Sequence, residues 1–579
     1  MEHNLEHIRH SLAHLLAAAV LKKWPDTKLG IGPVIENGFY YDFQFSQPIS
    51  DADLKDLEKQ MRKFVGGKLA FTGTEMSADE LKQKYAAQPF KLELIGEYAS
   101  EGRKLTSYKT GDIFEDLCKG GHVENTGEID PDSFKLTKLA GAYWRGDEKN
   151  AQLTRIYGLA FTSKAELDAH LTMLAEAEKR DHKKLGPAMD LFVFSPLVGP
   201  GLPLWTPKGT LVRTLLNDFV WNLRAARGYE RVEIPHITKK DLYETSGHWD
   251  KYKDDLFKIS TREDHEFAMK PMNCPHHTQI YNRKKWSYRE LPQRYESTTM
   301  VYRDEQSGEL AGLSRVLSIT QDDAHVFCRM ESFKQEALKV WEIIHDFYGA
   351  FGINLKVRLS RRDPEHPEKY LGDAANWEKA ESVLLEIIKE KNVEYVDGPG
   401  EAAFYGPKLD FMGTDAIGRQ HQVATIQLDF NQPERFDLSC VNEKGEDERI
   451  VMLHAAIMGS IERFMAILIE HYAGHFPLWL SPVQARVIAV SEKFQDYGGK
   501  VLADLKAAGI RAELAGSDET LGKRIRAAQV DKIPYVLVVG EEEVNSKTVA
   551  AKLHGEDLGK VAVNDLVARI QKEIANKVV

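Results

Sequence analysis

The sequence is poor in the features that mark secreted and membrane proteins. It has four cysteines in 579 residues, at wide and irregular spacing: Cys118, Cys274, Cys328 and Cys440. Such spacing favours reduced thiols or metal ligands over a disulfide framework. No apolar run approaches the roughly 18 residues of a membrane span, and the start of the chain lacks a basic segment followed by an apolar one. These absences predict a cytoplasmic protein without a membrane anchor.

An excess of positive charge is also missing. The net charge is −11, with 42% hydrophobic and 28% charged residues. This balance is typical of a globular protein and argues against indiscriminate nucleic-acid binding, although a local basic surface remains compatible with it. Because single cores stop growing at roughly 250 to 300 residues, the chain is expected to form three or four domains. It shows no internal repeats.

Two pairs of metal-ligating residue types lie in the first part of the chain. Residues 5–23 have apolar side chains at helical spacing, and His10 and His14 lie one turn apart on this helix. Cys118 and His122 flank a glycine-rich loop. A solvated helix face is the simpler interpretation of the histidine pair, and a tetrahedral zinc set of all four residues is the alternative. The sequence alone does not bring the two pairs together.

Later segments suggest the domain order. Residues 164–184 are predicted to form one connecting helix, residues 210–227 a helix that ends at Gly228, and residues 231–235 a strand that ends at a proline. Beyond Pro482, strands and helices alternate, which predicts a small α/β domain with a largely parallel sheet. Lys523, Arg524 and Arg526 on its second helix could contact RNA or simply form a solvated face.

Charged residues concentrate on a predicted hairpin at residues 301–325. Arg303 and Arg315 flank a glycine-bearing turn, and guanidinium groups can fork onto phosphate oxygens. Gln321 and Asp323 follow on the returning strand and could hold a cationic or hydroxylated substrate. A surface hairpin with ion pairs is the alternative. The pattern Arg-x-Glu, loop, Arg, Gln-Asp-Asp-Ala-His resembles motif 2 of the class II aminoacyl-tRNA synthetases.

Other segments extend the resemblance. Residues 231–235 resemble motif 1, and residues 458–464 resemble motif 3, with Ser460 where many class II enzymes have glycine. Residues 272–275, 405–408 and 427–430 resemble the bacterial threonyl-tRNA synthetase family, in the same order. Residues 9–14 and 140–147 resemble its editing domain. Many members begin with a ubiquitin-like domain, which this chain is expected to lack.

The resemblance implies an α+β multidomain fold: a class II antiparallel-sheet catalytic core with an N-terminal α+β editing domain and a C-terminal α/β anticodon-binding domain. The expected bounds are 1–163 for editing, 164–185 for the connecting helix, 186–481 for catalysis and 482–579 for anticodon binding. The implied partners are tRNA(Thr), ATP and L-threonine. Motif 1 implies a homodimer.

The same resemblance assigns the catalytic residues. One Zn²⁺ per chain is expected on Cys274, His325 and His454, whose separations fit no zinc finger. Three protein ligands leave zinc a position for substrate. Threonine is expected to contact Met272, Gln321, Asp323, Tyr405 and Lys408. Arg303, Arg315 and Arg463 are the expected catalytic residues, and ATP with Mg²⁺ is expected to bind Arg303, Glu305, Thr425, Gln427 and Arg463. Four residues depart from the family: Ile319 replaces the adenine-stacking aromatic residue, and His276, Ala311 and Leu317 replace a glycine, a histidine and an arginine.

The amino-acid chemistry then calls for a second site. A site built to bind a hydroxyl rejects an analogue that lacks it by roughly 10⁴ to 10⁵, whereas one missing methylene changes binding by only about 1 to 3 kcal/mol. Serine therefore enters a threonine site, and its product must be hydrolysed elsewhere. The resemblance assigns this editing to His10, His14, Asp116, Cys118 and His122. The predicted function is an ATP-dependent threonine–tRNA ligase that hydrolyses seryl-tRNA. A non-catalytic RNA-binding or amino-acid-sensing relative is the alternative, favoured by the departures at Ile319, Ala311 and Leu317.

Overall fold

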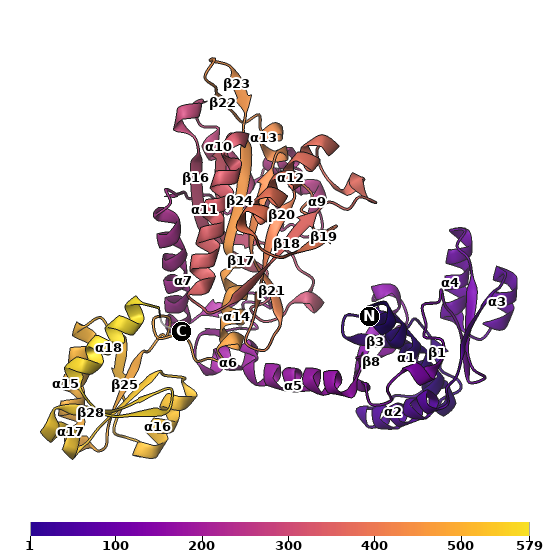
Figure 1. Ribbon diagram of the computed structural model, residues 1–579, viewed down its shortest axis with the longest axis horizontal. Helices are drawn as coiled ribbons and strands as arrows, with labels where there is room; N and C mark the ends of the chain where they lie inside the picture. Colours follow the sequence, from indigo (N-terminus) through magenta and orange to yellow (C-terminus); the bar gives the residue numbers. More distant parts are fainter. Residues whose placement is uncertain (1, 578–579) are drawn as a thin grey trace. The chain divides into compact units, whose positions relative to one another are not determined.

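The computed structural model describes residues 2–577, which form two compact units that divide between Glu176 and Ala177 (Figure 1). No helix among the described residues is both long enough and apolar enough to cross a membrane.

The first unit is built on α1 (Glu2–Lys23), whose apolar face packs against a sheet in the order β1-β3-β8-β7, with β2 paired to β3. The strands are β1 (Lys28–Leu29), β2 (Val34–Ile35), β3 (Gly38–Gln44), β7 (Phe134–Tyr143) and β8 (Gln152–Ala160). Ile35 pairs with Gly38, so a tight turn at Glu36 and Asn37 joins β2 to β3. A second sheet of β4 (Phe71–Glu75), β5 (Thr106–Thr110) and β6 (Phe114–Leu117) brings Cys118 next to α1. The remaining helices are α2 (Asp51–Gly66), α3 (Ala78–Lys84) and α4 (Pro89–Ser100).

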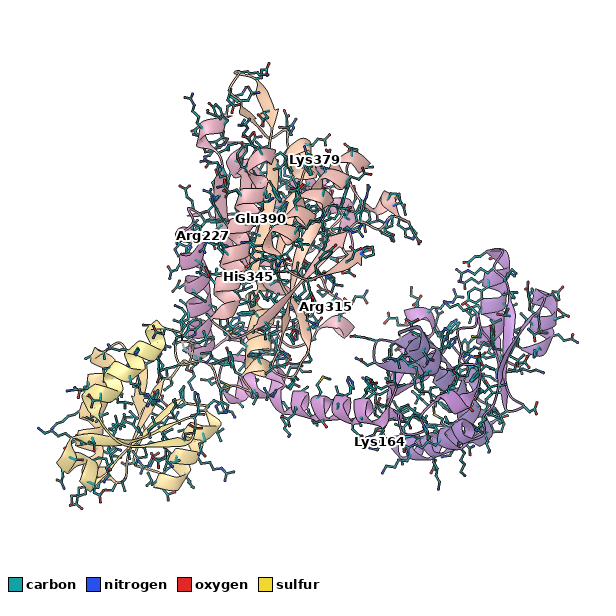
Figure 2. All side chains as sticks on the ribbon, in the orientation of Figure 1. Lys164, Arg227, Arg315, His345, Lys379 and Glu390 are labelled. Atoms are coloured by element: carbon teal, nitrogen blue, oxygen red, sulfur yellow. The ribbon has the colours of Figure 1, made fainter. Side chains whose placement is uncertain are left out.

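The predicted connecting helix is present but shorter than expected. Helix α5 (Lys164–Arg180) begins at Lys164 (Figure 2) and ends at Arg180, and a separate helix, α6 (His182–Ala188), begins two residues later. Asp181 has ψ 116°, outside the helical region, and its side chain accepts a hydrogen bond from the amide of Lys183. An aspartate that caps the next helix therefore breaks the Ala- and Glu-rich run.

The second unit is organised around an eight-stranded sheet in the order β11-β16-β17-β24-β21-β20-β18-β19. Its six central strands pair antiparallel, as expected for the catalytic core. Helices α7 (Pro207–Ala225), α11 (Met330–Gly349) and α14 (Ile461–His471) share a buried apolar core with this sheet. The strands are β11 (Glu230–Arg231), β16 (Gln293–Tyr302), β17 (Ser318–Cys328), β18 (Asn354–Arg361), β19 (Tyr395–Pro399), β20 (Lys408–Thr414), β21 (Gln420–Asp429) and β24 (Val451–Ser460).

Smaller elements complete the catalytic region. Helix α12 (Ala374–Lys391) packs against β18 and β20. The others are β9 (Phe192–Val193), β10 (Leu204–Trp205), β12 (Ile237–Lys239), α8 (Lys240–Ser246), α9 (His248–Lys251), β13 (Lys258–Ser260), β14 (Glu266–Met269), α10 (Cys274–Tyr281), β15 (Trp286–Ser287), α13 (Asn431–Arg435), β22 (Ser439–Val441) and β23 (Asp447–Arg449). The strand predicted at residues 231–235 is shorter than expected. Only the two residues of β11 pair with β16, and this pairing is parallel.

The C-terminal α/β region is confirmed, but its predicted parallel sheet is only half right. The order is β26-β25-β27-β28-β29, with parallel pairing among β26, β25 and β27 and antiparallel pairing through β28 and β29. The elements are β25 (Ala485–Ala489), α15 (Gln495–Ala507), β26 (Ala512–Leu514), α16 (Leu521–Val530), β27 (Tyr535–Val539), α17 (Glu541–Ser546), β28 (Thr548–Leu553), β29 (Glu556–Ala562) and α18 (Val563–Ala575).

The basic cluster on α16 also needs correction. Arg524 is buried, and its guanidinium donates hydrogen bonds to the carbonyl oxygens of Ala489 and Val490. Lys523 pairs with Glu519 at 2.9 Å. Arg524 therefore holds the end of β25 and belongs neither to an RNA surface nor to a solvated face.

Candidate active and editing sites

Strand pairing gathers several predicted metal, threonine and ATP contacts on one face of the large sheet. Alternate residues of a strand point the same way, so Gln321, Asp323 and His325 of β17 share a face. His325 lies opposite His454 of β24, and His454 lies opposite Gln427 of β21. Residues far apart in sequence thus form one row across three strands.

This row includes the predicted zinc ligands. Cys274 begins α10, and its sulfur lies with ring nitrogens of His325 and His454 in a group whose ligand atoms are all within 4.8 Å of one another. His325 Nε2 and His454 Nδ1 are 3.1 Å apart, and all three residues are buried. The structure therefore brings together three residues whose spacing in the sequence does not connect them.

Neighbouring groups orient these ligands. His454 Nε2 lies 2.9 Å from Asp429 Oδ2, so the carboxylate fixes the proton on that nitrogen and leaves Nδ1 free to bind a metal. His325 Nδ1 lies 2.8 Å from Nδ1 of His277, whose Nε2 contacts Ser297. Burial lowers the pKa of His325, which keeps its imidazole neutral. One thiol and two imidazoles with a carboxylate behind them suit Zn²⁺.

The predicted threonine contacts lie around this group. The carboxylate of Asp323 accepts a hydrogen bond from Asn273 at 3.1 Å, and burial raises the pKa of Asp323 to about 6. The Tyr405 ring lies 5.2 Å from the His454 ring, and Met272 contacts Arg303 through its sulfur. Lys408 lies opposite Gln427 in the same row and forms an ion pair with Asp410 at 2.8 Å.

The predicted ATP residues line a cavity of about 710 Å³ on the same face. Its wall includes Arg303, Glu305, Thr425 and Arg463, whereas Gln427 is buried in the row with His454. The predicted catalytic residue Arg315 also lines it. Among the described residues, neither Arg303 nor Arg463 has a carboxylate in ion-pair contact, and Nε of Arg303 is buried without a partner. Two unpaired guanidinium groups in one cavity favour an anion such as a phosphate chain. Ile319, the departure at the adenine position, also lines this cavity.

Arg315 differs from the other two arginines. It lies at the surface (Figure 2) and pairs with Glu305 at 2.5 Å and Glu309 at 3.2 Å. Ala311 is exposed in the same loop, and the amide of Leu317 donates to the carbonyl of Gly201. The backbone of the loop is therefore still held to Gly201, although Ala311 and Leu317 depart from the family.

Arg463 is positioned by the start of α14. Ser460 caps this helix by accepting a hydrogen bond from the Arg463 amide at 3.2 Å. Asp322, buried behind the strand, accepts hydrogen bonds from the amides of Ile457 and Gly459 across an irregularity between β17 and β24. The fixed bend directs the helix that carries Arg463 along the cavity wall.

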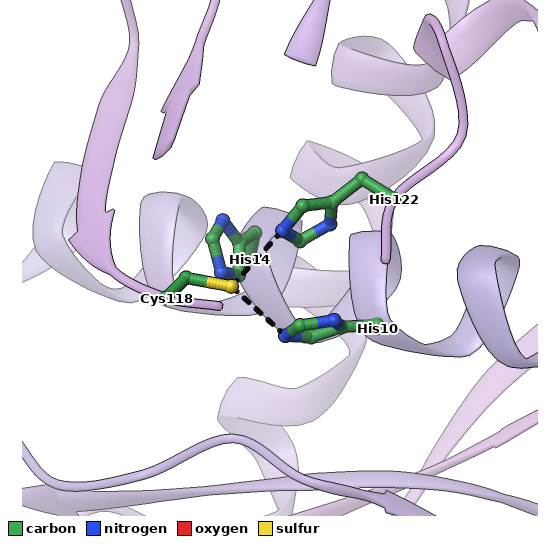
Figure 3. Close-up of side chains that lie close together, drawn as sticks. All are labelled: His10, His14, Cys118 and His122. Carbon is green, nitrogen blue, oxygen red and sulfur yellow. Dashed lines mark hydrogen bonds between the residues drawn. The ribbon is translucent and has the colours of Figure 1, made fainter. Parts of the chain in front are cut away.

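The predicted editing residues also come together, in the first unit (Figure 3). Cys118 Sγ lies 3.4 Å from Nε2 of His10 and 3.3 Å from Nε2 of His122. With His14 these residues form a cluster whose ligand atoms all lie within 4.8 Å of one another. Ser11 contacts the other nitrogen of His122 at 3.2 Å. Gly120 and Gly121 have φ of 94° and 85°, which lets the loop turn back onto α1.

Burial keeps the side chains of this cluster, called the editing cluster below, in their neutral forms. It raises the pKa of Cys118 to about 11 and lowers that of His122 to about 3, and it lowers the pKa values of His10 and His14 as well. A thiolate–imidazolium pair of the kind used by cysteine nucleophiles is therefore disfavoured. The arrangement can orient a water molecule or hold a metal ion.

Asp116 lies beside the cluster in a network that the sequence did not reveal. Its carboxylate pairs with buried Lys91 at 2.6 Å and accepts a hydrogen bond from Tyr41 at 2.5 Å. These three residues, with His10 and Cys118, line a cavity of about 370 Å³. Lys91 gives this cavity a cationic group, although no spacing in the sequence pointed to it.

A buried histidine next to the metal group, the set of Cys274, His325 and His454, was also missed in the sequence. His248 begins α9, contacts Ser246 at 2.8 Å through Nδ1 and lies 3.9 Å from the Cys274 sulfur through Nε2. Its only signal in the sequence was a glycine followed by histidine at the end of a short helix, which is a common helix stop.

Family models match three parts of the chain. Residues 257–472 match the class II core domain of tRNA synthetases for G, H, P, S and T, residues 484–573 match an anticodon binding domain, and residues 105–157 match the second additional domain of threonyl and alanyl tRNA synthetases. The fold and the site thus define a class II aminoacyl-tRNA synthetase architecture.

Full-length relatives narrow the class. Threonine–tRNA ligase of Gloeobacter violaceus is 48% identical over 99% of this chain and 93% of its own, and that of Cytophaga hutchinsonii is 48% identical over 98% and 88%. A structure of the RNA binding domain of threonyl-tRNA synthetase from Cryptosporidium parvum Iowa II is 36% identical, with a TM-score of 0.64 over 68% of this chain and 98% of that one. The chain belongs to the threonine–tRNA ligase family.

Proposed function

We propose that the protein attaches L-threonine to tRNA(Thr) with ATP, through a threonyl-adenylate, and hydrolyses seryl-tRNA(Thr) formed in error. One observation carries the proposal: the Cys274, His325 and His454 group lies on the same sheet face as a cavity that contains two unpaired arginines. An amino-acid site beside a phosphate site is what adenylate formation requires.

In the proposed first step, a carboxylate oxygen of threonine attacks the α-phosphorus of ATP, and pyrophosphate leaves. Arg303 stabilises charge on the α-phosphate and Arg463 holds the terminal phosphate, both through charge-assisted hydrogen bonds. Mg²⁺ would enter with ATP. In the second step, a terminal ribose hydroxyl of the tRNA attacks the threonyl carbonyl, and AMP leaves.

Threonine selectivity is assigned to the buried group. Cys274, His325 and His454 would hold Zn²⁺, which when bound supplies a Lewis acid for the amino and hydroxyl groups of threonine. Asp323 accepts from the amino group, and Gln321 and Tyr405 line the remaining space. Gln321 Oε1 is buried without a partner, as a group reserved for substrate would be.

Editing is assigned to the first unit. The neutral set of His10, His14, Cys118 and His122 would orient a water molecule toward the seryl ester, because its pKa values disfavour a thiolate. Lys91 and Asp116 line the adjacent cavity. A homodimer and a cytoplasmic location remain part of the proposal.

The test is threonine-dependent exchange of pyrophosphate into ATP. Arg303→Ala and Arg463→Ala should each reduce exchange by more than about 10²-fold, the scale of one lost transition-state donor. Arg361→Ala is the matched control, because Arg361 pairs with Asp397 outside the cavity. Exchange that is absent from the unmodified protein would instead favour the non-catalytic relative, and normal exchange in either cavity variant would contradict the assigned roles.

A further inference from the structure

His182 lies in a third group of side chains that are spaced like metal ligands, with Asp181 and Glu470. It follows α5 and is 4% exposed. Its Nδ1 lies 2.6 Å from Glu470 Oε1, and its Nε2 lies 3.0 Å from the amide nitrogen of Leu313. Because both ring nitrogens already have protein partners, His182 acts as a bridge and not as a metal ligand.

The partners define the tautomer of this bridge. The Leu313 amide can only donate, so His182 Nε2 is the acceptor, and Nδ1 carries the proton that it donates to Glu470. Glu470 also accepts from Arg419 at 2.6 Å, and its pKa is lowered by the bonds from His182 and Arg419 although burial acts in the opposite direction. The carboxylate is therefore charged and firmly held.

The bridge joins two parts of the cavity wall. Leu313 is buried in the loop between β16 and β17, and the next three residues, 314–316, line the 710 Å³ cavity. Glu470 lines the same cavity from α14, the helix that carries Arg463. Arg180, the last residue of α5, donates to the carbonyl of His471 at 3.0 Å, so the α5–α6 junction also holds the C-terminal end of α14.

We propose that His182 is a positioning residue of the nucleotide site: it clamps the loop that carries Arg315 to the helix that carries Arg463, and so sets the affinity for ATP. The proposal rests on the proposed function, which makes this cavity the ATP site. Gly312 supports it independently. A Cβ at this position would lie 2.4 Å from His182 Nε2, and the φ of Gly312 is 56°, so the loop approaches the imidazole at a residue without a side chain.

The test compares His182→Asn with His182→Gln in binding of Mg²⁺–ATP by titration calorimetry. Glutamine places its amide oxygen near the position of Nε2 and can still accept from Leu313, whereas asparagine reaches only Glu470 and leaves the buried amide without an acceptor. His182→Asn should weaken ATP binding by at least about fivefold, the lower range for an unsatisfied buried donor, and His182→Gln by less than about twofold. Threonine affinity should stay unchanged in both. Gly312→Ala should weaken ATP binding like His182→Asn.

His475→Asn is the matched control, since His475 contacts Lys532 and lies outside the cavity wall. Equal ATP affinity in His182→Asn and the unmodified protein would overturn the proposal, as would equal losses in the asparagine and glutamine variants. Exchange with threonine, measured in parallel on the unmodified protein, tests the proposed function separately. A protein that binds ATP without exchange would refute that function and leave the calorimetric comparison decisive for His182.

Discussion

At the scale of single residues, the metal group shows that strand pairing can form a candidate metal site that no local sequence pattern marks. Cys274, His325 and His454 sit on a helix start and two strands, and only the pairing of β17 with β24 places the two histidines opposite each other. Burial raises the pKa of the Cys274 thiol well above its usual range, so a bound divalent cation is what would favour the thiolate there.

Removal of one ligand tests this group. Cys274→Ser should lose the single Zn²⁺ that we expect per chain, because serine replaces a soft thiolate ligand with a hydroxyl. Cys440→Ser is the control, since Cys440 is equally buried but outside the group. Metal content by atomic emission measures both. Zinc retained in Cys274→Ser but lost in His10→Asn would move the metal to the editing cluster.

The sequence alone supported these residues only through family resemblance. Spacing identified the His10 and His14 pair, because a helix turn is a local relation. It did not identify His248, Lys91 or Asp429, whose roles depend on which segments fold against each other. The role of Arg524 was misjudged for the same reason, since its carbonyl partners lie at the end of β25.

At the scale of elements, helices with strong periodicity were predicted to within a few residues, as for α1 and α7. One error came from a short polar signal, because Asp181 interrupts the connecting helix. Another concerned strand direction, because β28 and β29 join the C-terminal sheet in antiparallel pairing. Strand direction depends on tertiary pairing, which propensity does not encode.

The cap of α14 gives a prediction at this scale. Ser460→Ala removes the acceptor for the Arg463 amide and should cost about 1 kcal/mol, whereas Ser460→Gly should cost only a few tenths. In calorimetric melting, alanine should lower the transition temperature by about 2 °C. Both variants should keep Arg463 in the cavity and retain exchange activity. A glycine variant less stable than the alanine variant would show that the hydroxyl does not act as a cap.

At the scale of the whole molecule, the two proposed chemistries belong to different compact units. The editing cluster lies within residues 1–176, and the metal group and the ATP cavity lie within residues 177–579. Each unit has its own buried apolar core. Damage to one site should therefore leave the other site intact, because changes with no shared partners act independently.

This separation predicts a selective defect. His14→Ala and Cys118→Ala should accumulate seryl-tRNA(Thr) while forming threonyl-tRNA(Thr) at the normal rate, and His170→Ala should behave like the unmodified protein because His170 lies on α5 and is not part of the cluster. Pre-formed seryl-tRNA(Thr) offered to each variant measures hydrolysis directly, without activation. Since burial keeps the Cys118 thiol neutral, Cys118→Ser should retain more hydrolysis than Cys118→Ala by preserving a hydrogen-bonding group. Deacylation at the normal rate in both alanine variants would place editing elsewhere, and a covalent seryl adduct on Cys118 in mass spectra would contradict the water mechanism.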